Sequence, residues 1–424
     1  MSITRRSFIT QTAAFAGLTT FPLGHTLAKT VPPSDQIRVA GIGLGRRGRV
    51  VLQSFLEQPD VKFVAIADVQ QERREIIRRT VNRHYGNEAC QEYSHMDEVL
   101  ERSDIDAVII ATGDRWHGTA SIYAAQAGKD IYCEKPCTMS IVESQELETA
   151  VKKAKRIYQS GLQRRNVDNF ITATELARSG KLGKLHTLHA GIWLPQPEKP
   201  NLPGEPEPDK DIVDWDGWCG PAAIRPYNSE YVRSAAKWRH YAGFSAGWGL
   251  HDWSSHTLNL CQWANDADDT APVEYEFRND EFHCRYANGV KLVMRIAGFG
   301  DQGDWLGLGS CPVRYEGDAG WVEAGDNGKI VASDPGLLKG NMPSEMPGVD
   351  PSKNVREFLD CVKSRGRTAC NESVTRRSEN ASHAAAISWK LGKRLKFDPV
   401  KERFVNAPEA NAYRAYARRK GYTI

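Results

Sequence analysis

The stretch IRVAGIGLGRRG, residues 37–48, decides the fold that we expect for this chain. Its first six residues suit a short buried strand, and Gly43, Gly45 and Gly48 follow with G-x-G-x-x-G spacing. Apolar residues at helical spacing between 50 and 56 then predict a helix. Such glycines permit a tight turn and let backbone N–H groups approach a pyrophosphate at the helix N-terminus. The stretch predicts the start of a dinucleotide-binding domain, with a glycine-rich turn of another α/β fold as the alternative.

Three further predicted strands continue the same pattern along the chain. Residues 63–67, 107–112 and 130–133 form short apolar runs, and helical patterns separate them. The first run ends at Asp68, twenty residues after Gly48, where a carboxylate would accept ribose hydroxyl groups. The alternation of strand and helix predicts an α/β fold with a doubly wound parallel sheet.

The choice between NAD and NADP depends on the charges near that ribose. Asp68 favours NAD, because a carboxylate repels a 2′-phosphate. Arg46, Arg47, Arg73 and Arg74 could each bind such a phosphate. Both cofactors therefore stay open.

Length and composition restrict the class of protein. A chain of 424 residues predicts two domains with a substantial core. The net charge is +3 and the charges are interspersed, which argues against a nucleic-acid groove or a polybasic membrane patch. The nine cysteines are scattered and include no C-x-x-C pair, so neither a zinc site nor a disulfide framework is indicated. We expect a small, weakly charged partner.

The N-terminus has the features of an export signal. TRRSFI at 4–9 precedes an apolar run from Ala13 to Leu23 and then the small-residue site TLA at 26–28. Residues 1–28 therefore resemble a twin-arginine signal peptide, which predicts a periplasmic or otherwise exported protein. The apolar run is too short to span a bilayer, so we expect no stable membrane anchor. A disordered basic N-terminus of a cytoplasmic enzyme is the alternative.

Three motifs together resemble the signatures of the Gfo/Idh/MocA oxidoreductases, which include glucose-fructose oxidoreductase and inositol dehydrogenase. They are the glycine-rich turn at 43–48, ATGDRWH at 111–117 and EKP at 134–136. Similar segments follow at 215–227, 238–239, 252–256 and 354–411, so the resemblance covers nearly all of the chain after residue 28. It implies an N-terminal Rossmann domain, a C-terminal α+β domain with an open, largely antiparallel sheet, and a homo-oligomer.

We divide the chain on this basis. Residues 1–28 are the signal, 35–160 the Rossmann domain, 161–396 the substrate-binding and oligomerisation domain, and 397–424 a tail expected to reach a neighbouring subunit. Asn288-Gly289, between two strand-like runs, predicts a type I′ hairpin in the second domain. Six prolines between 195 and 208 predict a loop or flap.

Lys135, Asp252 and His256 are the candidate catalytic residues. Lys135 follows the fourth predicted strand, at the edge where an open α/β sheet binds its ligand, and its ammonium can bind a substrate hydroxyl. Asp252 and His256 are four residues apart on a predicted helix, where a neutral imidazole can accept an alcohol proton. The resemblance implies that the three form the family's Lys/Asp/His set. A solvated lysine and an ordinary helix-face ion pair are the alternatives.

The remaining site residues follow from the motifs. The predicted cofactor-binding residues are Gly43, Gly45, Arg46, Arg47, Gly48, Asp68, Thr112, Trp116, His117, Glu134, Lys135 and Gln163. Arg164, Trp193, Arg239 and His251 are predicted to contact the substrate. We expect no metal, because His251 would point elsewhere on the helix and no third histidine has ligand spacing.

The expected reaction is NAD(P)-dependent hydride transfer from a ring or anomeric carbon of a sugar or cyclitol. A tightly held nucleotide, regenerated by a second sugar, would suit an exported enzyme. The alternative is a glycoside hydrolase that uses NAD transiently to oxidise the ring and eliminate the aglycone. Glycosidases of this type often lack the lysine of the EKP motif, so Lys135 favours the first reading. A catalytically silent sugar-binding protein is the third possibility.

Overall fold

The computed structural model describes residues 32–233, 235–241, 243–296, 308–340 and 347–422. The predicted twin-arginine signal lies outside the described residues. The chain divides into two units, Met1–Asp35 and Gln36–Ile424, and everything below concerns the second. In the described part of the chain, no helix is both long enough and apolar enough to cross a membrane.

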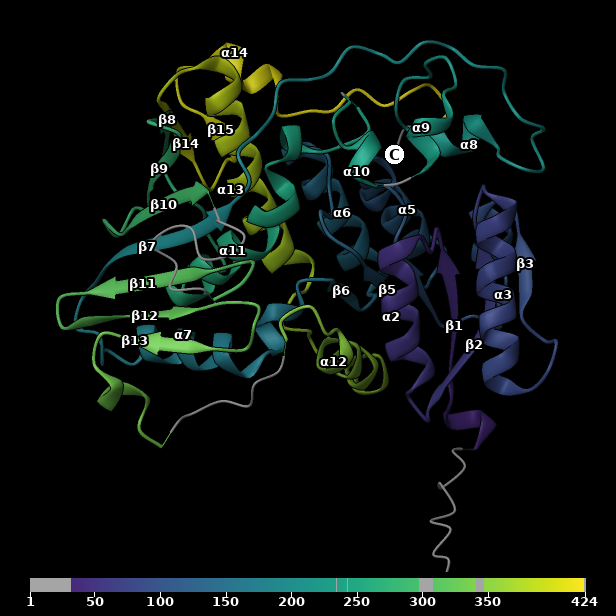
Figure 1. Cartoon of the computed structure of the whole chain (residues 1–424), viewed down its shortest axis with the longest axis horizontal. Coiled ribbons are helices and arrows are strands. Elements are labelled where there is room, and N and C mark those ends of the chain that lie inside the picture. The colour runs from purple at the N-terminus through teal and green to yellow at the C-terminus, as the bar shows by residue number, and fades with distance from the viewer. Residues whose placement is uncertain (1–31, 234, 242, 297–307, 341–346, 423–424) are drawn as a thin grey trace, which may run out of the picture. The chain divides into compact units, whose positions relative to one another are not determined.

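The first sheet has six parallel strands in the order β3-β2-β1-β4-β5-β6 (Figure 1). They are β1 (Ile37–Ile42), β2 (Val61–Ala67), β3 (Gln91–Tyr93), β4 (Ala107–Ile110), β5 (Asp130–Cys133) and β6 (Tyr158–Ser160). The strand order reverses between β1 and β4, and ligands of doubly wound sheets bind at such a point. The predicted doubly wound sheet is confirmed.

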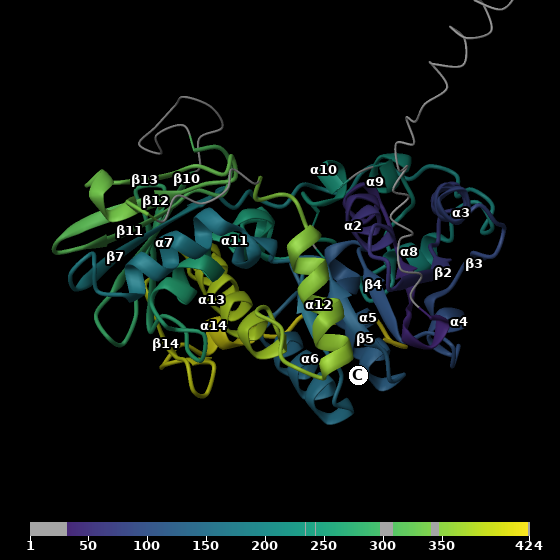
Figure 2. The same cartoon turned by 90° about the horizontal axis from the view of Figure 1, so that it is seen from below.

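Helices cover both faces of this sheet, and each face has its own apolar core. α2 (Arg46–Leu56) and α3 (Gln71–Tyr85) pack on one face, while α4 (Met96–Leu100), α5 (Asp114–Gln126) and α6 (Ile141–Ala154) pack on the other. A helix from far along the chain, α12 (Ser352–Ser364), completes the first face through Phe358, whose ring meets Phe55 and Tyr132 edge-on. α12 therefore lies between the first sheet and the rest of the unit (Figure 2).

The second sheet has nine strands in the order β13-β12-β11-β7-β10-β9-β8-β14-β15. β7 (Leu185–Ile192) and β10 (Lys291–Ile296) pair in parallel, and every other described pair is antiparallel. The others are β8 (Glu274–Arg278), β9 (Glu281–Arg285), β11 (Val313–Gly317), β12 (Gly320–Ala324), β13 (Ile330–Ala332), β14 (Leu395–Asp398) and β15 (Arg403–Phe404). α7 (Asp168–Arg178), α11 (His251–Ala264) and α13 (Glu372–Leu391) pack on one face. The expected open, largely antiparallel sheet is confirmed.

Two details of this region differ from the prediction. Of Asn288 and Gly289 only Gly289 has positive φ, +90°, so the β9–β10 hairpin is not type I′. Gly289 N–H donates to the carbonyl of Tyr286, which closes a turn one residue earlier and leaves Gly289 as a left-handed bulge residue. The proposed boundary between 396 and 397 falls inside β14, so the second domain continues into residues assigned to the tail.

Short helices and loops join the two sheets beside the carboxyl ends of the first. They include α8 (Trp215–Cys219), α9 (Ser229–Arg233), α10 (Ala235–Trp238) and the 3-10 helices Gln163–Asn166 and Gly247–Gly249. α14 (Pro408–Ala412) and the 3-10 helix Pro335–Leu338 pack instead at the two edges of the second sheet. Trp215 and Trp218 of α8 stack at 4.9 Å and pack with Tyr231 and Phe244 into a separate aromatic core. This core holds the loops that border the site.

Candidate active site

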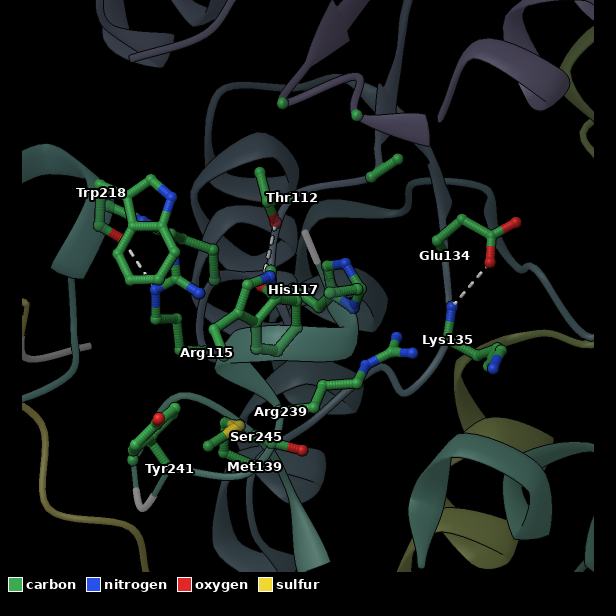
Figure 3. A pocket seen from close by; sticks show the side chains of 18 of the residues that line it. Thr112, Arg115, His117, Glu134, Lys135, Met139, Trp218, Arg239, Tyr241 and Ser245 are labelled. Atoms are coloured by element: carbon green, nitrogen blue, oxygen red, sulfur yellow. Dashed lines mark hydrogen bonds between the residues drawn. The ribbon is translucent and has the colours of Figure 1, made fainter. Parts of the chain in front are cut away.

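One cavity of about 1480 Å³ opens at the carboxyl ends of β1, β4 and β5 (Figure 3). Thirteen of the predicted site residues line it: Gly43, Gly45, Arg46, Arg47, Asp68, Thr112, Trp116, His117, Glu134, Lys135, Trp193, Arg239 and Asp252. Gly48, Gln163, Arg164, His251 and His256 do not line it. The structure therefore brings most of the predicted residues together around the cavity, and five of them lie behind the residues that line it.

The glycine-rich turn forms one end of the cavity. Gly43 has φ +68°, and a Cβ there would lie 2.3 Å from Cγ2 of Thr112, so only glycine fits. Gly48 lies beneath the turn, where a Cβ would come within 3.0 Å of the Ala111 side chain and push α2 off the sheet. The turn is thus shaped for close approach of a phosphate group to the backbone.

Asp68 closes the same end. One of its carboxylate oxygens accepts the Gln70 N–H at 3.0 Å, whereas Oδ2 is buried and has no hydrogen-bond partner among the described residues. Burial raises the pKa of this carboxyl, against the opposing effect of Arg73 and Arg74. A buried oxygen that lacks a donor fits a ribose hydroxyl.

The four arginines near this end differ in their availability. Arg74 donates to the backbone carbonyls of Asp68 and Asp211, and Arg47 pairs with Glu134 at 3.0 Å. Arg46 and Arg73 line the cavity beside the turn, although one Arg73 nitrogen donates to the Val232 carbonyl. Only these two are placed to meet a 2′-phosphate near Asp68, and the preference between NAD and NADP stays open.

Trp116 and His117, on the first turn of α5, occupy the middle of the cavity. The Trp116 indole N–H donates to the Gly217 carbonyl at 2.9 Å, and a Cβ on Gly220 would lie 2.1 Å from the indole ring. His117 Nδ1 donates to the Pro136 carbonyl at 2.6 Å, which leaves its Nε2 as an acceptor without a partner among the described residues. Burial lowers the pKa of His117, so its ring is neutral.

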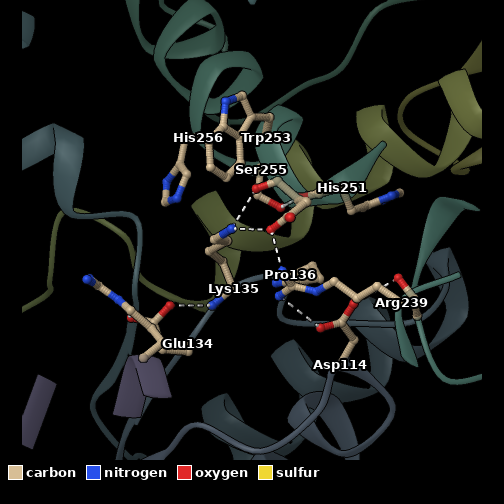
Figure 4. Close-up of polar contacts among 12 residues, drawn as sticks. Asp114, Glu134, Lys135, Pro136, Arg239, His251, Trp253, Ser255 and His256 are labelled. Carbon is tan, nitrogen blue, oxygen red and sulfur yellow. Dashed lines mark hydrogen bonds and ion pairs between the residues drawn. The ribbon is translucent and has the colours of Figure 1, made fainter. Parts of the chain in front are cut away.

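Lys135 and Asp252 form the other end of the cavity. Figure 4 draws the polar contacts around Lys135. The Lys135 ammonium donates to Asp252 Oδ1 at 2.8 Å and to the Asp252 backbone carbonyl at 2.6 Å. Arg239 donates to the same Oδ1 at 2.8 Å and lies 3.6 Å from Asp114, which also accepts a hydrogen bond from Ser245. The result is a chain of alternating charges, Lys135–Asp252–Arg239–Asp114.

This charge chain determines the protonation of Asp252. Burial alone would raise the pKa of the Asp252 carboxyl, but the neighbouring Lys135 and Arg239 outweigh it and the pKa is lowered. Asp252 is therefore a carboxylate that can accept hydrogen bonds from substrate hydroxyls, beside an ammonium and a guanidinium that can donate them.

His256 lies one helical turn beyond Asp252 on α11, as predicted, but in a closed environment. Its Nε2 accepts a hydrogen bond from Arg164 at 2.8 Å, and Arg164 is held by both oxygens of Asp326 at 3.0 and 2.6 Å. Burial lowers the pKa of His256 well below its usual range, and the charges of Arg164, Lys135 and Arg47 lower it further. The ring is neutral, and its basic nitrogen faces Arg164.

The other predicted residues behind the wall have structural partners. Gln163 accepts a hydrogen bond from Arg164, and both side chains are almost fully buried. His251 is fully buried and points away from Lys135 (Figure 4). Substrate contact by Arg164 and His251, cofactor contact by Gln163, and proton transfer by His256 stay predictions.

Several residues at the site were missed from the sequence. Asp114 belongs to the ATGDRWH motif, and its position a few residues after a buried strand was the available signal. Trp253 stacks on Trp193 with ring centroids 4.7 Å apart, and the Lys135 ammonium lies 5.3 Å from the Trp253 ring. This aromatic pair lines the cavity next to Asp252.

The C-terminal tail also borders the cavity, which the sequence did not indicate. Tyr416 donates to the Gly243 carbonyl, Arg419 pairs with Asp216, and Tyr422 meets Trp116 edge-on at 5.3 Å. The described part of the tail thus packs on its own chain, because its aromatic and cationic side chains find partners around α8 and α5. The expected contact of this tail with a neighbouring subunit stays a prediction.

Comparisons with known proteins agree with this architecture. Residues 37–162 match the oxidoreductase-family NAD-binding Rossmann fold, and residues 193–424 match the C-terminal alpha/beta domain of the same family. The chain is 37% identical over 150 residues to scyllo-inositol 2-dehydrogenase (NAD(+)) of Bacillus subtilis, covering 35% of this chain and 42% of that protein. It is 35% identical over 162 residues to Glycosyl hydrolase family 109 protein 1 of Phocaeicola vulgatus, covering 37% and 34%.

The chain therefore matches less than half of the length of these curated relatives. A solved structure of levoglucosan dehydrogenase, in complex with NADH and levoglucosan, superimposes with a TM-score of 0.60 at 17% identity. That superposition covers 85% of this chain and 99% of the other, and it supports the fold. With both domain models matched in order, the chain belongs to the Gfo/Idh/MocA oxidoreductase family.

Proposed function

We propose that this protein is an NAD(P)-dependent oxidoreductase that moves a hydride between a nicotinamide and a hydroxyl-bearing carbon of a sugar or cyclitol. One observation carries the proposal. A single cavity joins the glycine turn and the unsatisfied oxygen of Asp68 to the Lys135–Asp252–Arg239 charge chain. The residues that would bind the nucleotide and those that would bind a polyol thus line the same cavity.

The cradle fits a dinucleotide. Gly43 and Gly45 would hold the pyrophosphate, and Asp68 Oδ2 would accept a ribose hydroxyl. The bound nicotinamide would supply the hydride acceptor. Residues of the tail, including Tyr416 and Tyr422, border the same cavity, which supports a tightly held nucleotide.

The other end suits a neutral polyol. Neighbouring hydroxyls of a sugar or cyclitol each need a donor and an acceptor, and Lys135, Asp252 and Arg239 offer both within one ring's width. The stacked Trp193 and Trp253 provide an apolar wall against which ring C–H groups can pack. The NAD-dependent inositol dehydrogenase among the relatives supports the same substrate class.

Oxidation of a secondary alcohol breaks one C–H and one O–H bond and forms a carbonyl. We assign the hydroxyl proton to Nε2 of His256, with Lys135 and Asp252 holding the neighbouring oxygens. Before His256 Nε2 can accept this proton, the hydrogen bond that Arg164 donates to it at 2.8 Å must break. Active-site hydrogen bonds commonly rearrange when substrate binds, so this geometry is compatible with the role.

Two further features belong to the proposal. Residues 1–28 direct export through the twin-arginine route, which carries folded proteins and would let the nucleotide leave the cytoplasm inside the enzyme.

The face of the nine-stranded sheet that lacks the helices is the surface through which copies of the chain assemble. Its partly exposed side chains include Arg314 and Glu316, which pair with one another.

Mass spectrometry of the denatured, freshly purified protein tests the proposal. We expect stoichiometric NAD(H) or NADP(H), which also decides the question raised by Asp68 and Arg73. A protein that carries no nucleotide and binds neither one when titrated would contradict the proposal.

The similarity to glycosyl hydrolase family 109 supports a second candidate, a hydrolase that oxidises the ring transiently and eliminates the aglycone. Release of nitrophenol from synthetic glycosides, dependent on NAD but without net NADH formation, would favour this candidate. The absence of release from either anomer of a panel of glycosides would count against it.

A further inference from the structure

Behind the cavity wall, three potential metal ligands from distant parts of the chain lie together. His251 begins α11, whereas Glu379 and His383 are on consecutive turns of α13. One ligand atom from each lies within 4.8 Å of the other two, and all three side chains are buried. His383 also lines the cavity, so the cluster is not sealed from it.

The cluster contains polar atoms that the protein itself does not satisfy. Both ring nitrogens of His251 and Oε2 of Glu379 are buried and make no hydrogen bond of normal geometry within the described part of the chain. The closest approach between them, from His251 Nε2 to Glu379 Oε2, is 4.0 Å, too long for a hydrogen bond. Buried groups left in this state usually indicate an unseen water or ion.

The rest of the geometry orients these atoms toward a common point. A Cβ on Gly247 would lie 1.9 Å from His251 Nδ1, so that side of the ring abuts the backbone and Nε2 faces Glu379. The His251 and His383 rings are 4.2 Å apart and tilted by 40°, which lets their nitrogens converge. His383 Nε2 lies 3.3 Å from the Thr138 hydroxyl, the type of contact that fixes the tautomer of a metal-binding histidine.

Two imidazoles and one carboxylate are a donor set that binds zinc and other divalent transition metals. Metal–ligand bonds of about 2.0–2.2 Å would require the ligand atoms to move closer by roughly 1 Å, which rotation of the side chains allows. We propose that His251, Glu379 and His383 bind one divalent transition-metal ion, with zinc as the simplest occupant. This revises the expectation of no metal, which considered only ligands close together in sequence.

Such an ion would support the charge chain from behind. Glu379 Oε1 accepts the Cys137 N–H at 3.1 Å and lies 3.4 Å from the Ser255 hydroxyl. Glu379 thereby touches both the loop that carries Lys135 and the helix that carries Asp252. The ion would tie α11 to α13 directly behind Asp252, as a structural site that positions the Lys135–Asp252 pair.

Metal analysis of the full protein, purified without chelator or metal-affinity resin, tests the proposal. We expect about one divalent ion per chain in the wild type and less than about a tenth of that in Glu379→Gln and His383→Asn, because each removes one of only three ligands. His256→Asn is the matched control, since His256 is a buried histidine on the same helix outside the cluster. It should keep its metal.

Zinc titration of chelator-treated protein gives a second readout that does not depend on activity. We expect zinc to raise the unfolding temperature of the wild type and of His256→Asn by several degrees and to leave Glu379→Gln unchanged. A wild type without metal that also fails to respond to zinc, manganese or iron(II) would overturn the proposal. Metal retained equally in Glu379→Gln and His383→Asn would overturn it as well, because the ion would then bind elsewhere.

Discussion

The two ends of the cavity differ in how their polar groups are satisfied. At the nucleotide end, Asp68 Oδ2 is buried without a hydrogen-bond partner in the described structure, as is His117 Nε2 in the middle of the cavity. At the other end, Lys135, Asp252 and Arg239 already hold one another at hydrogen-bond distances. Arg239 Nε and Asp114 Oδ1 at this end also lack hydrogen-bond partners among the described residues. The difference therefore lies in the carboxylates: Asp68 has an oxygen without a donor, whereas Asp252 is held by two cations.

This difference has consequences for binding and for catalysis. A dinucleotide gains the full benefit of satisfying buried groups, so the first end should supply most of the binding energy. A sugar must replace existing ion-pair contacts with its hydroxyls, so the second end gains little net affinity. The ordered charges there stabilise the developing carbonyl and alkoxide instead. Substitutions at the two ends should therefore change different quantities.

Loss of Lys135 has the largest expected effect. Lys135→Met removes the ammonium that binds the reacting end of the substrate, and kcat/KM for sugar oxidation should fall by about 10²–10⁴-fold. Steady-state formation of reduced nicotinamide measures it. Lys152→Met is the control, because Lys152 is an exposed lysine on α6 that pairs with Glu148 outside the cavity lining, and its activity should be unchanged. Wild-type kcat/KM in Lys135→Met would remove Lys135 from the mechanism.

A methyl group in the glycine turn should affect the nucleotide end selectively. In Gly43→Ala, the alanine must adopt a left-handed φ and its methyl group would lie 2.3 Å from Thr112. The unfolding free energy should fall by about 1–3 kcal/mol more than in a control variant that has the left-handed φ but no such contact. Gly86→Ala is that control, since Gly86 has φ +65° but open space around its Cβ position. Denaturant unfolding and nucleotide titration measure both effects. Equal stability and nucleotide affinity in the two variants would contradict a tightly fitted turn.

A contact outside the cavity should change stability alone. Asp60 is bound by Arg356 and Lys363 of α12, and these cations lower its pKa to about 2 despite burial. Because the folded-state pKa is depressed, the stabilisation is present above the unfolded pKa of about 3.9 and is lost as pH falls toward 2.

Asp60→Asn should therefore lower the unfolding free energy by about 1–2 kcal/mol at neutral pH and by less near pH 3. The exposed Asp104 pairs with Arg38 and Arg102, and Asp104→Asn should have a smaller effect. A loss in Asp60→Asn that does not vary with pH would show that the ion pairs are not its source.

The smallest expected effect is on the pH dependence of kcat/KM. Burial and three neighbouring cations hold the pKa of His256 well below 6.5, so the ring stays the neutral base below that pH. The plot of kcat/KM should show no acid limb near pH 6.5. A limb at that position, absent from His256→Asn, would mean that the imidazole is exposed in the working enzyme.

Much of the fold was predictable because its signals are local. Spacing and hydrophobicity predict the strand, the glycine-rich turn and the helix within residues 37–56. They also predict the acidic residue that follows β2. Lys135 could be placed at the sheet edge for the same reason. Each of these features depends on residues that are neighbours in sequence.

The rest depends on contacts between distant segments, about which periodicity carries no information. Nothing near Phe358 shows that it packs on Phe55 and Tyr132, and nothing near Tyr422 shows that it meets Trp116. The burial of His256 comes from Arg164 and Asp326, and the cluster around His251 comes from α13. Local patterns placed these residues on the correct elements but could not identify their partners.

Calorimetric titration of nucleotide-free protein with NAD⁺ tests the separation of the two ends most directly. Asp68→Asn should weaken NAD⁺ binding by about tenfold or more, because it takes the charged acceptor from a ribose hydroxyl. Lys135→Met should bind NAD⁺ as the wild type does, although it does not oxidise sugar. Equal weakening in both variants, or undiminished binding in Asp68→Asn, would contradict the account.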